Sequence, residues 1–267
     1  MKNIFNRNLF FISFLFIILI ITNSYAGVDF DTTDDRLTCG NNSSILTENG
    51  AMSIALWIFP RIGGNVNARI VGRGLSNLGR ELRFTWKDIN TLNFSVNTSG
   101  TTLDREASDN SLTLNVWQHI GMTWDGSLTA ANVKFYVNGI ETSYKTTQDG
   151  TGTPNDNSAD DIYIGNRNLT PEPDRGIDSI MSDIVIWGAV NTSDNMLQLA
   201  SSKVKRIPLQ VNPSNLQAYW ALDDEPDGTS VDGNTFIDLT GNGNTCTGNN
   251  GANNTGLLAK AEEVLTY

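Results

Sequence analysis

The chain has 267 residues and a formal net charge of -11, with 18 basic residues against 29 acidic ones. That excess of negative charge disfavours nucleic acid or an anionic lipid surface as the main partner. Eleven Phe, six Trp and six Tyr provide enough apolar material for a packed core, which excludes a fully disordered chain.

The first 26 residues have the layout of a secretory signal peptide. Lys2 and Arg7 precede an apolar run over residues 9–21, and Ser24-Tyr25-Ala26 places small residues at the two positions that determine cleavage. The run is too short to span a bilayer comfortably, although an uncleaved anchor is the alternative. We therefore predict a secreted or periplasmic protein that begins at Gly27 and does not insert into the membrane after cleavage.

The chain has two cysteines, Cys39 and Cys246, near the two ends of the predicted mature region. In an oxidising compartment they are a plausible disulfide pair, and two buried thiols that never meet are the alternative. The only histidine is His119, and the chain contains no Cys-X-X-Cys motif. These counts exclude a zinc site of the usual cysteine and histidine type.

The mature region consists of short apolar or alternating runs separated by Gly, Asn, Asp and Pro, which is typical of strands and turns. Residues 52–59 are apolar on both alternation phases, as in a strand covered on both faces. Residues 81–87 and 91–97 alternate, which predicts one buried and one hydrated face in each strand. Further strands are predicted at 116–124, 133–137, 162–164, 184–187 and 217–222.

Two dipeptides predict tight turns between strands. Asn138-Gly139 follows the strand at 133–137 and leads into residues 140–145, and Asp125-Gly126 has the same chemistry. Both dipeptides favour hairpins between sequential strands.

One short helix is predicted from Ser193 to about Ser201. Thr192 is its capping hydroxyl, and Met196, Leu197 and Leu199 are expected to face the body of the protein. With no alternation of strands and helices elsewhere, the pattern predicts an antiparallel all-β sandwich in one domain over residues 27–267.

Six segments carry short motifs in a fixed order. They are VDFDTTDD at 28–35, WQHIGMTWDG at 117–126, VKFYVNG at 133–139, IYIGN at 162–166, MSDIVIW at 181–187 and DLTGNGN at 238–244. Together they resemble the laminin-G-like domains of the concanavalin A-like lectin and glucanase superfamily. The resemblance implies a two-sheet jelly-roll sandwich. Thr32 and Ser179 stand where that family usually has glycine.

The resemblance also bears on the cysteines. The family fold places the first and last strands side by side in one sheet, which brings Cys39 close to Cys246. The resemblance therefore implies a disulfide between them.

An enzyme of this superfamily would need acids that this sequence does not present in the expected pattern. Retaining glycosidases require two carboxylates about 5 Å apart, and the glucanase strand motif with three spaced acids does not occur here. Asp178 and Asp183 are expected on opposite faces of a strand. We therefore predict no catalysis, with a polysaccharide-active hydrolase or lyase as the less favoured alternative.

The aromatic side chains and the histidine are expected in the core. His119 alternates with Trp117 and is predicted to be a hydrogen-bonded core residue. Packing roles are also expected for Trp57, Trp86, Trp124 and Trp220. Trp187 and Tyr163 are the aromatic residues we expect to be most exposed.

Candidate ligand-binding residues come from two places. The hydrated faces of the strands at 81–87 and 91–97 offer Arg83, Lys87, Asn93 and Asn97, whose planar donors suit sugar hydroxyls, although a merely hydrated face is the alternative. The loop at 169–177 adds Glu172, Asp174 and Arg175. Its two carboxylates make calcium a candidate cofactor, with solvated loop acids as the alternative.

The sequence thus favours an exported, non-catalytic module for carbohydrate binding or adhesion. The expected partner is a glycan or cell-surface polysaccharide. The alternative is a structural domain whose partner is a surface protein.

Overall fold

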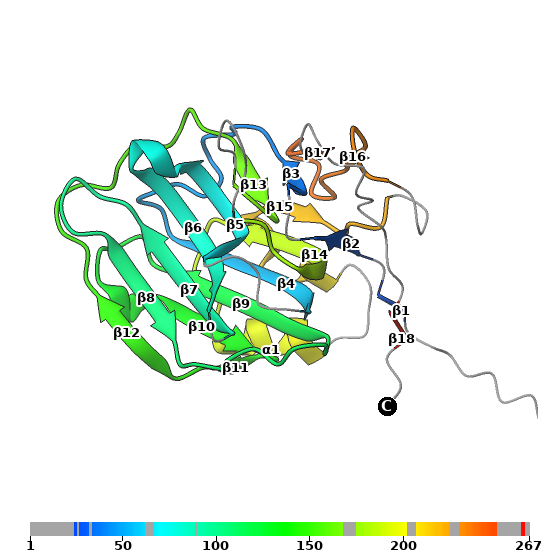
Figure 1. Ribbon diagram of the computed structural model, residues 1–267, viewed down its shortest axis with the longest axis horizontal. Coiled ribbons are helices and arrows are strands. Elements are labelled where there is room, and N and C mark those ends of the chain that lie inside the picture. Colours follow the sequence, from blue (N-terminus) through cyan, green and yellow to red (C-terminus); the bar gives the residue numbers. More distant parts are fainter. Residues whose placement is uncertain are drawn as a thin grey trace, which may run out of the picture.

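Two antiparallel β-sheets lie face to face in the computed structural model of the protein (Figure 1). The structure describes residues 24–25, 27–31, 34–61, 67–88, 90–167, 175–201, 207–224, 230–249 and 263–264. A separate two-stranded pair joins β1 (Ser24–Tyr25) to β18 (Glu263–Val264). Because β1 precedes the predicted cleavage site, cleavage there would remove this pair.

The larger sheet has nine strands within the described residues. They are β3 (Arg36–Thr38), β5 (Ala68–Leu75), β6 (Arg80–Lys87), β7 (Thr91–Val96), β8 (Leu103–Ala107), β12 (Tyr144–Gln148), β13 (Ile162–Ile164), β16 (Thr235–Phe236) and β17 (Cys246–Asn249). Their order is β12-β8-β7-β6-β5-β13-β3-β17-β16. β13 therefore lies between β5 and β3, although it is far from both in the sequence.

The second sheet has seven strands within the same described ranges. They are β2 (Val28–Phe30), β4 (Met52–Pro60), β9 (Gln118–Trp124), β10 (Lys134–Val137), β11 (Ile140–Glu141), β14 (Ser179–Trp187) and β15 (Leu216–Trp220). Their order is β11-β10-β9-β4-β14-β15, with β2 also paired to β14. These crossovers between distant strands confirm the predicted jelly-roll sandwich.

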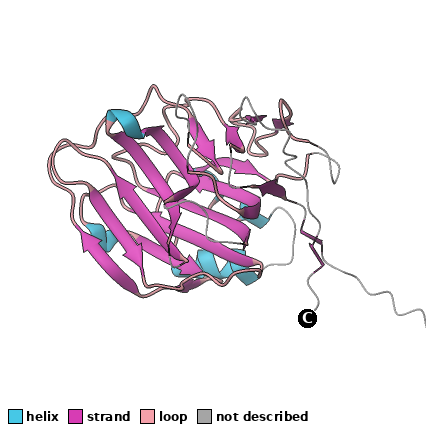
Figure 2. Cartoon of the chain, viewed as in Figure 1, coloured by secondary structure: helices cyan, strands magenta, loops and turns pink. Residues whose placement is uncertain are grey.

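Helical segments lie around the margin of the strands (Figure 2). The α-helix is α1 (Ser193–Ser201), and the short 3-10 turns are η1 (Ser76–Leu78), η2 (Ala130–Asn132), η3 (Ile207–Gln210) and η4 (Pro213–Asn215). No helix in the described part of the chain is long and apolar enough to cross a membrane.

The core lies between the two sheets. Leu82, Phe84 and Trp86 point inward from β6 and are fully buried, as their alternation predicts. Aromatic rings join the sheets: Phe84 stacks on Phe135 with ring centroids 6.0 Å apart, and Phe94 meets Trp124 at 5.3 Å. The pattern of apolar residues therefore places both sheets correctly.

Several strands escape the sequence prediction, and two of the longer ones, β5 and β8, do so because they do not alternate cleanly. β5 carries two arginines and two glycines within eight residues, and β8 carries two acids and an arginine within five. All the predicted strands are present, and β14 begins five residues before the predicted start. At the predicted hairpin, Asn138 and Gly139 both have positive φ, as the tight turn requires.

The predicted helix is confirmed, but one side chain is misplaced. The Thr192 hydroxyl accepts a hydrogen bond from the Asn195 backbone N–H at 3.2 Å, so Thr192 caps the helix. Met196 and Leu199 are buried, whereas Leu197 is 50% exposed. Leu197 follows Met196 directly, so on a helix the two side chains point in different directions.

The expectation that Trp187 and Tyr163 are exposed is wrong. Trp187 belongs to a second apolar cluster on the outside of the seven-stranded sheet, which also contains Met196 and Leu199 of α1. Its indole N–H donates to the Val211 carbonyl at 2.9 Å. Tyr163 is 3% exposed, between its strand neighbours Thr38 and Gly72. The alternation of apolar and polar residues along a strand does not reveal that distant segments bury the outer face of a sheet.

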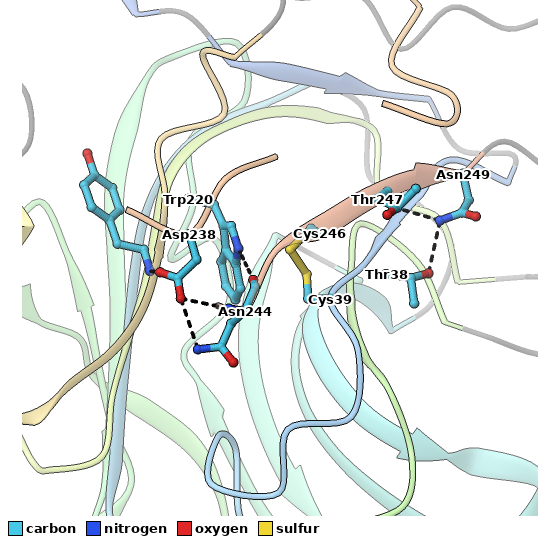
Figure 3. The surroundings of a disulfide bond; sticks show 9 residues. Thr38, Cys39, Trp220, Asp238, Asn244, Cys246, Thr247 and Asn249 are labelled. Carbon is cyan, nitrogen blue, oxygen red and sulfur yellow. Dashed lines mark hydrogen bonds between the residues drawn. A yellow bond between two sulfur atoms is a disulfide. The ribbon is translucent and has the colours of Figure 1, made fainter. Parts of the chain in front are cut away.

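The predicted disulfide between Cys39 and Cys246 is present and buried (Figure 3). Antiparallel pairing of β3 with β17 places Thr38 opposite Thr247. Cys39, which follows Thr38, therefore lies opposite Cys246, which precedes Thr247. The bond closes a loop of 207 residues and ties the start of the sandwich to its end.

Candidate functional site

The outer face of the nine-stranded sheet carries an open hollow of about 260 Å³, over β5 and β6. We call it the arginine hollow. Its described lining combines four guanidinium groups with one carboxylate and two amides, on Asn67, Arg69, Glu81, Arg83, Asn97, Arg167 and Arg175. Positive charge is therefore concentrated here in a chain whose net charge is -11.

Strand geometry places the hollow's central residues. Glu81 and Arg83 alternate with the core residues of β6, so they point outward. On β5, the pairing shifts between Arg69 and Val71. Because of this bulge, Arg69 lies opposite the outward residue Thr85, whereas Arg73 lies opposite the core residue Leu82.

A buried ion pair forms the floor of the hollow. Arg69 donates to both carboxylate oxygens of Glu81, at 2.6 and 2.8 Å, and both side chains are less than 5% exposed. Burial lowers the pKa of Arg69 to about 10, against the opposing effect of Glu81 and together with repulsion from Arg83 and Arg167. Arg69 therefore stays cationic at neutral pH, and this pair is rigid.

Arg83 stands beside this floor and is held by Asn97. Its guanidinium donates to the Asn97 side-chain oxygen at 3.1 Å and lies 3.5 Å from a Glu81 oxygen. The same Asn97 oxygen accepts the Glu81 backbone N–H at 3.2 Å, and its amide nitrogen donates to Thr102 at 3.3 Å. The Arg83 side chain is 21% exposed, so a bound molecule can reach it.

Asn166 brings the other two arginines to the hollow. Its buried side-chain oxygen accepts the backbone N–H of Arg167 at 2.8 Å and that of Arg175 at 3.0 Å. The Arg175 carbonyl in turn accepts the Arg69 backbone N–H at 2.9 Å, which ties this point to β5. One amide therefore fixes both ends of the intervening loop.

Glycine is required at the position before this amide. Gly165 has a φ of +86°, and a Cβ there would lie 2.3 Å from the Phe30 ring. The IGN motif found in the sequence thus turns the chain sharply after β13 and positions Asn166.

The structure brings three of the predicted ligand-binding residues together in the hollow: Arg83, Asn97 and Arg175. Lys87 lies on the same strand and face as Arg83 but outside the hollow, where it pairs with Glu106 at 3.2 Å. Glu172 and Asp174 lie outside the described residues.

Asn93 differs from the prediction that it lies on a hydrated face. It is 1% exposed and its amide donates to the Asp104 side chain and the Arg105 carbonyl, both at 2.9 Å. Ser95 is also buried and donates to Asn93. Polar side chains on the neighbouring strands cover one another here, so the polar alternation of β7 does not indicate access to water.

Sequence reasoning missed Asn67, Arg69, Glu81 and Arg167 as site residues. The strand carrying Arg69 was not predicted, and Glu81 was treated as the start of a strand. The available signal was the density of arginine on two adjacent segments, at positions 69, 73, 80 and 83 of an arginine-poor chain. The pairing of β5 with β6 was needed to turn that density into a site.

The predicted core histidine is buried outside the hollow. His119 is 2% exposed and meets Trp57 edge-on at 5.5 Å, and burial lowers the pKa of its imidazole to about 3. Its Nδ1 atom has no hydrogen-bond partner among the described residues, so the expected hydrogen bond is not found at that atom. The imidazole is neutral at physiological pH.

The described residues contain no group of three or more His, Cys, Asp or Glu side chains that could hold a metal ion. The two acids behind the calcium expectation lie outside those residues.

A family model described as the concanavalin A-like lectin/glucanases superfamily matches residues 31–196, and the chain belongs to this superfamily. Among solved structures, a putative carbohydrate binding protein from Bacteroides ovatus ATCC 8483 is similar, with 17% identity and a TM-score of 0.57. That match covers 91% of this chain and 61% of the other, so this chain spans about three fifths of that protein's length.

Two further structures show the same kind of likeness. The enzymatically active domain of tailspike protein 2 from bacteriophage CBA120 has 13% identity and a TM-score of 0.51, covering 75% of this chain and 30% of the other. Domains LG4-5 of the mouse laminin alpha1 chain have 14% identity and a TM-score of 0.45, covering 63% and 43%. No curated protein sequence matches the chain. At these identities the likeness is one of fold alone.

Proposed function

We propose that the chain is an exported, non-catalytic carbohydrate-binding module whose binding site is the arginine hollow. The observation that carries this proposal is the set of planar guanidinium and amide donors around an open hollow on one sheet face. Membership of a superfamily of lectins and glucanases supports it. So does the similarity in fold to a putative carbohydrate binding protein.

The hollow is suited to sugar because several of its groups are held in place before a ligand arrives. Asn97 holds Arg83, and Asn166 holds the backbone of Arg167 and Arg175. Guanidinium groups donate in fixed directions, which matches the fixed geometry of hydroxyl and oxyanion groups on a sugar ring. Preorganisation of this kind reduces the entropy lost on binding.

The hollow's acid supports binding without chemistry. Glycoside hydrolysis by the usual route needs two carboxylates, one of which acts as a proton donor. Among the described lining residues Glu81 is the one carboxylate, and both its oxygens are bound by Arg69. The chain's single histidine is buried elsewhere, so it is not available as a base in the hollow.

Two features support export. The first 26 residues have the layout of a signal peptide, and the chain carries a buried disulfide that needs an oxidising compartment to persist.

Retention on immobilised polysaccharides tests this function. The purified, disulfide-bonded protein is passed over dextran, galactan, polygalacturonate and dextran sulfate, beside Arg83→Gln and the surface control Lys134→Gln. We expect retention on at least one polymer, its loss in Arg83→Gln and its persistence in Lys134→Gln. Lys134 is a suitable control because it forms an exposed ion pair with Glu141, outside the hollow.

Two results would overturn the proposal. Failure to bind any polymer would favour a protein partner instead. Release of new reducing ends from a bound polymer would show that the protein is an enzyme.

A further inference from the structure

We infer that the sugar bound in the arginine hollow is anionic, and carries a carboxylate or a sulfate group. This inference rests on the proposed function and names the class of glycan. It draws on the balance of charge in the hollow, the residue types that line it, and the way its arginines are held.

The first argument is the charge balance at the floor. Glu81 is shared by two guanidinium groups: Arg69 binds both of its oxygens, and Arg83 lies 3.5 Å from one of them. The other partner of Arg83 is the neutral oxygen of Asn97, at 3.1 Å. Two cations therefore face one anion, and the Arg83 side chain, 21% exposed, is the more accessible of the two.

The second argument is the electrostatic effect of the arginines on one another. Arg83 and Arg167 both repel the charge on Arg69, which adds to the effect of burial in lowering the pKa of Arg69. An anion that enters the hollow relieves this repulsion, whereas a neutral sugar does not. The charge-assisted hydrogen bonds that the anion forms are also about twice as strong as neutral ones.

The third argument is the composition of the lining. Pockets for uncharged organic ligands are lined mainly by apolar and aromatic side chains. Among the described residues that line this hollow, none is aromatic or aliphatic. Affinity here must come from polar and charged contacts. Arginine is the residue best suited to these contacts, because its planar guanidinium group forms bidentate hydrogen bonds with carboxylate and sulfate.

The fold already shows that a carboxylate fits this geometry. Glu81 takes two parallel hydrogen bonds from Arg69 at the floor of the hollow. Arg83 lies next to this pair, and Arg167 and Arg175, whose backbone N–H groups Asn166 accepts, line the same hollow. The hollow therefore gathers several guanidinium groups within one small volume.

Matched polymer pairs test the inference. Affinity is measured for polygalacturonate against its carboxyl-reduced form, and for dextran sulfate against dextran, at equal low salt. We expect the anionic member of at least one pair to bind about tenfold tighter or more, with added salt weakening binding. The pair that responds distinguishes carboxylate from sulfate. Non-specific attraction does not explain such a result, because the protein itself is acidic.

Three variants locate the effect. Arg83→Gln should lose about tenfold in affinity for the anionic polymer, and Arg83→Lys should lose part of it because it keeps the charge without the planar fork. Lys134→Gln should bind as the wild type does. Melting temperatures check that all three proteins fold, and Arg83→Lys keeps the test valid if Arg83→Gln does not.

The outcomes separate the two proposals. Equal affinity for the charged and neutral members of both pairs overturns the anionic sugar and leaves carbohydrate binding intact. Equal weakening by Arg83→Gln and Lys134→Gln also overturns it, because the attraction would then belong to the surface as a whole. A protein that binds none of the four polymers overturns both proposals.

Discussion

Two buried arginines on one strand have opposite roles. Arg69 and Arg73 are four residues apart on β5, a spacing that puts side chains on the same face of a regular strand. The bulge after Arg69 sends them to opposite faces. Arg69 enters the arginine hollow, and Arg73 enters a cage of backbone carbonyls at the end of the sandwich.

The carbonyl cage leaves Arg73 nothing to offer a ligand. Each of its three nitrogens donates to two main-chain oxygens, from the two segments 41–45 and 157–160. These acceptors are the carbonyls of Asn41, Asn42, Ile45, Asn157, Ser158 and Asp160, at 2.5 to 3.1 Å. Arg73 is 1% exposed. It does for these loops what a bound cation does in other proteins.

The contrast teaches how to separate a structural arginine from a functional one. Burial alone does not separate them, because Arg69 and Arg73 are both buried. The distinction lies in the acceptors, because backbone carbonyls take all the donors of Arg73. Arg69 donates one nitrogen to the Asn67 carbonyl, but the other two to the Glu81 carboxylate, which Arg83 also approaches.

The largest expected effect concerns the disulfide beside the carbonyl cage. Cys39 lies two residues before Asn41, so the bond anchors one of the two cage segments. Reduction should lower the free energy of unfolding by up to roughly 5 kcal/mol in the chain-entropy account of a loop of 207 residues. Urea denaturation with and without reductant measures this. Unchanged stability on reduction would contradict the assigned role of the bond.

Arg73→Met should cost about 3 to 5 kcal/mol of stability, because it leaves buried carbonyls without their donors. Below its melting transition the variant should bind polysaccharide with wild-type affinity, since Arg73 points away from the hollow. Calorimetric melting and affinity measurements on one preparation test both statements. A loss of stability below about 1 kcal/mol would show that segments 41–45 and 157–160 keep their conformation without Arg73.

Asp35 sharpens the comparison, because it is a buried charge with incomplete pairing. One carboxylate oxygen accepts the Asp31 backbone N–H at 2.8 Å, and the other has no hydrogen-bond partner among the described residues. Burial, with repulsion from Asp31 and Asp34, raises the pKa of Asp35 from 3.8 to about 7. Between those values the folded state keeps a proton that the unfolded state has released. Stability from this group therefore falls as pH rises from 4 to 7.

Asp35→Asn should remove this loss of stability with rising pH, because asparagine does not titrate. The variant should be more stable than the wild type by up to about 4 kcal/mol at pH 8, with the difference vanishing near pH 4. Melting temperatures of both proteins across this range provide the measurement. A constant difference at all pH values would mean that Asp35 does not titrate as described.

The smallest expected change in stability is at Asn166. Asn166→Ala removes the acceptor for two backbone N–H groups and should cost about 1 kcal/mol. It should weaken binding of the anionic polymer more than it weakens the fold, because it releases the backbone of Arg167 and Arg175. Wild-type affinity in Asn166→Ala would show that other contacts hold the backbone of Arg167 and Arg175.

The sequence predicts the parts of this molecule that depend on local pattern. Alternation along 81–87 places Arg83 outward, and the motifs at 117–126 and 238–244 indicate the superfamily and its joined ends. Burial by a distant segment is beyond such patterns. Trp187 is buried in an outer cluster with residues of α1 and with Val211, and Asn93 is buried among polar neighbours on β6 and β8. The site is only half visible for the same reason: Arg69 turns outward through a bulge that pairing with β6 defines.

The central claim is that a sugar contacts the arginines of the hollow. The most direct test is a titration of the folded protein with oligogalacturonate, and separately with short sulfated dextran, followed through the side-chain N–H signals of its arginines by NMR. Variants at Arg69, Arg73 and Arg83 assign those signals. The account predicts that the signal of Arg83 shifts with ligand and that the signal of Arg73, locked in the carbonyl cage, stays in place. Binding that leaves the hollow's arginines unchanged, with shifts elsewhere on the protein, would contradict it.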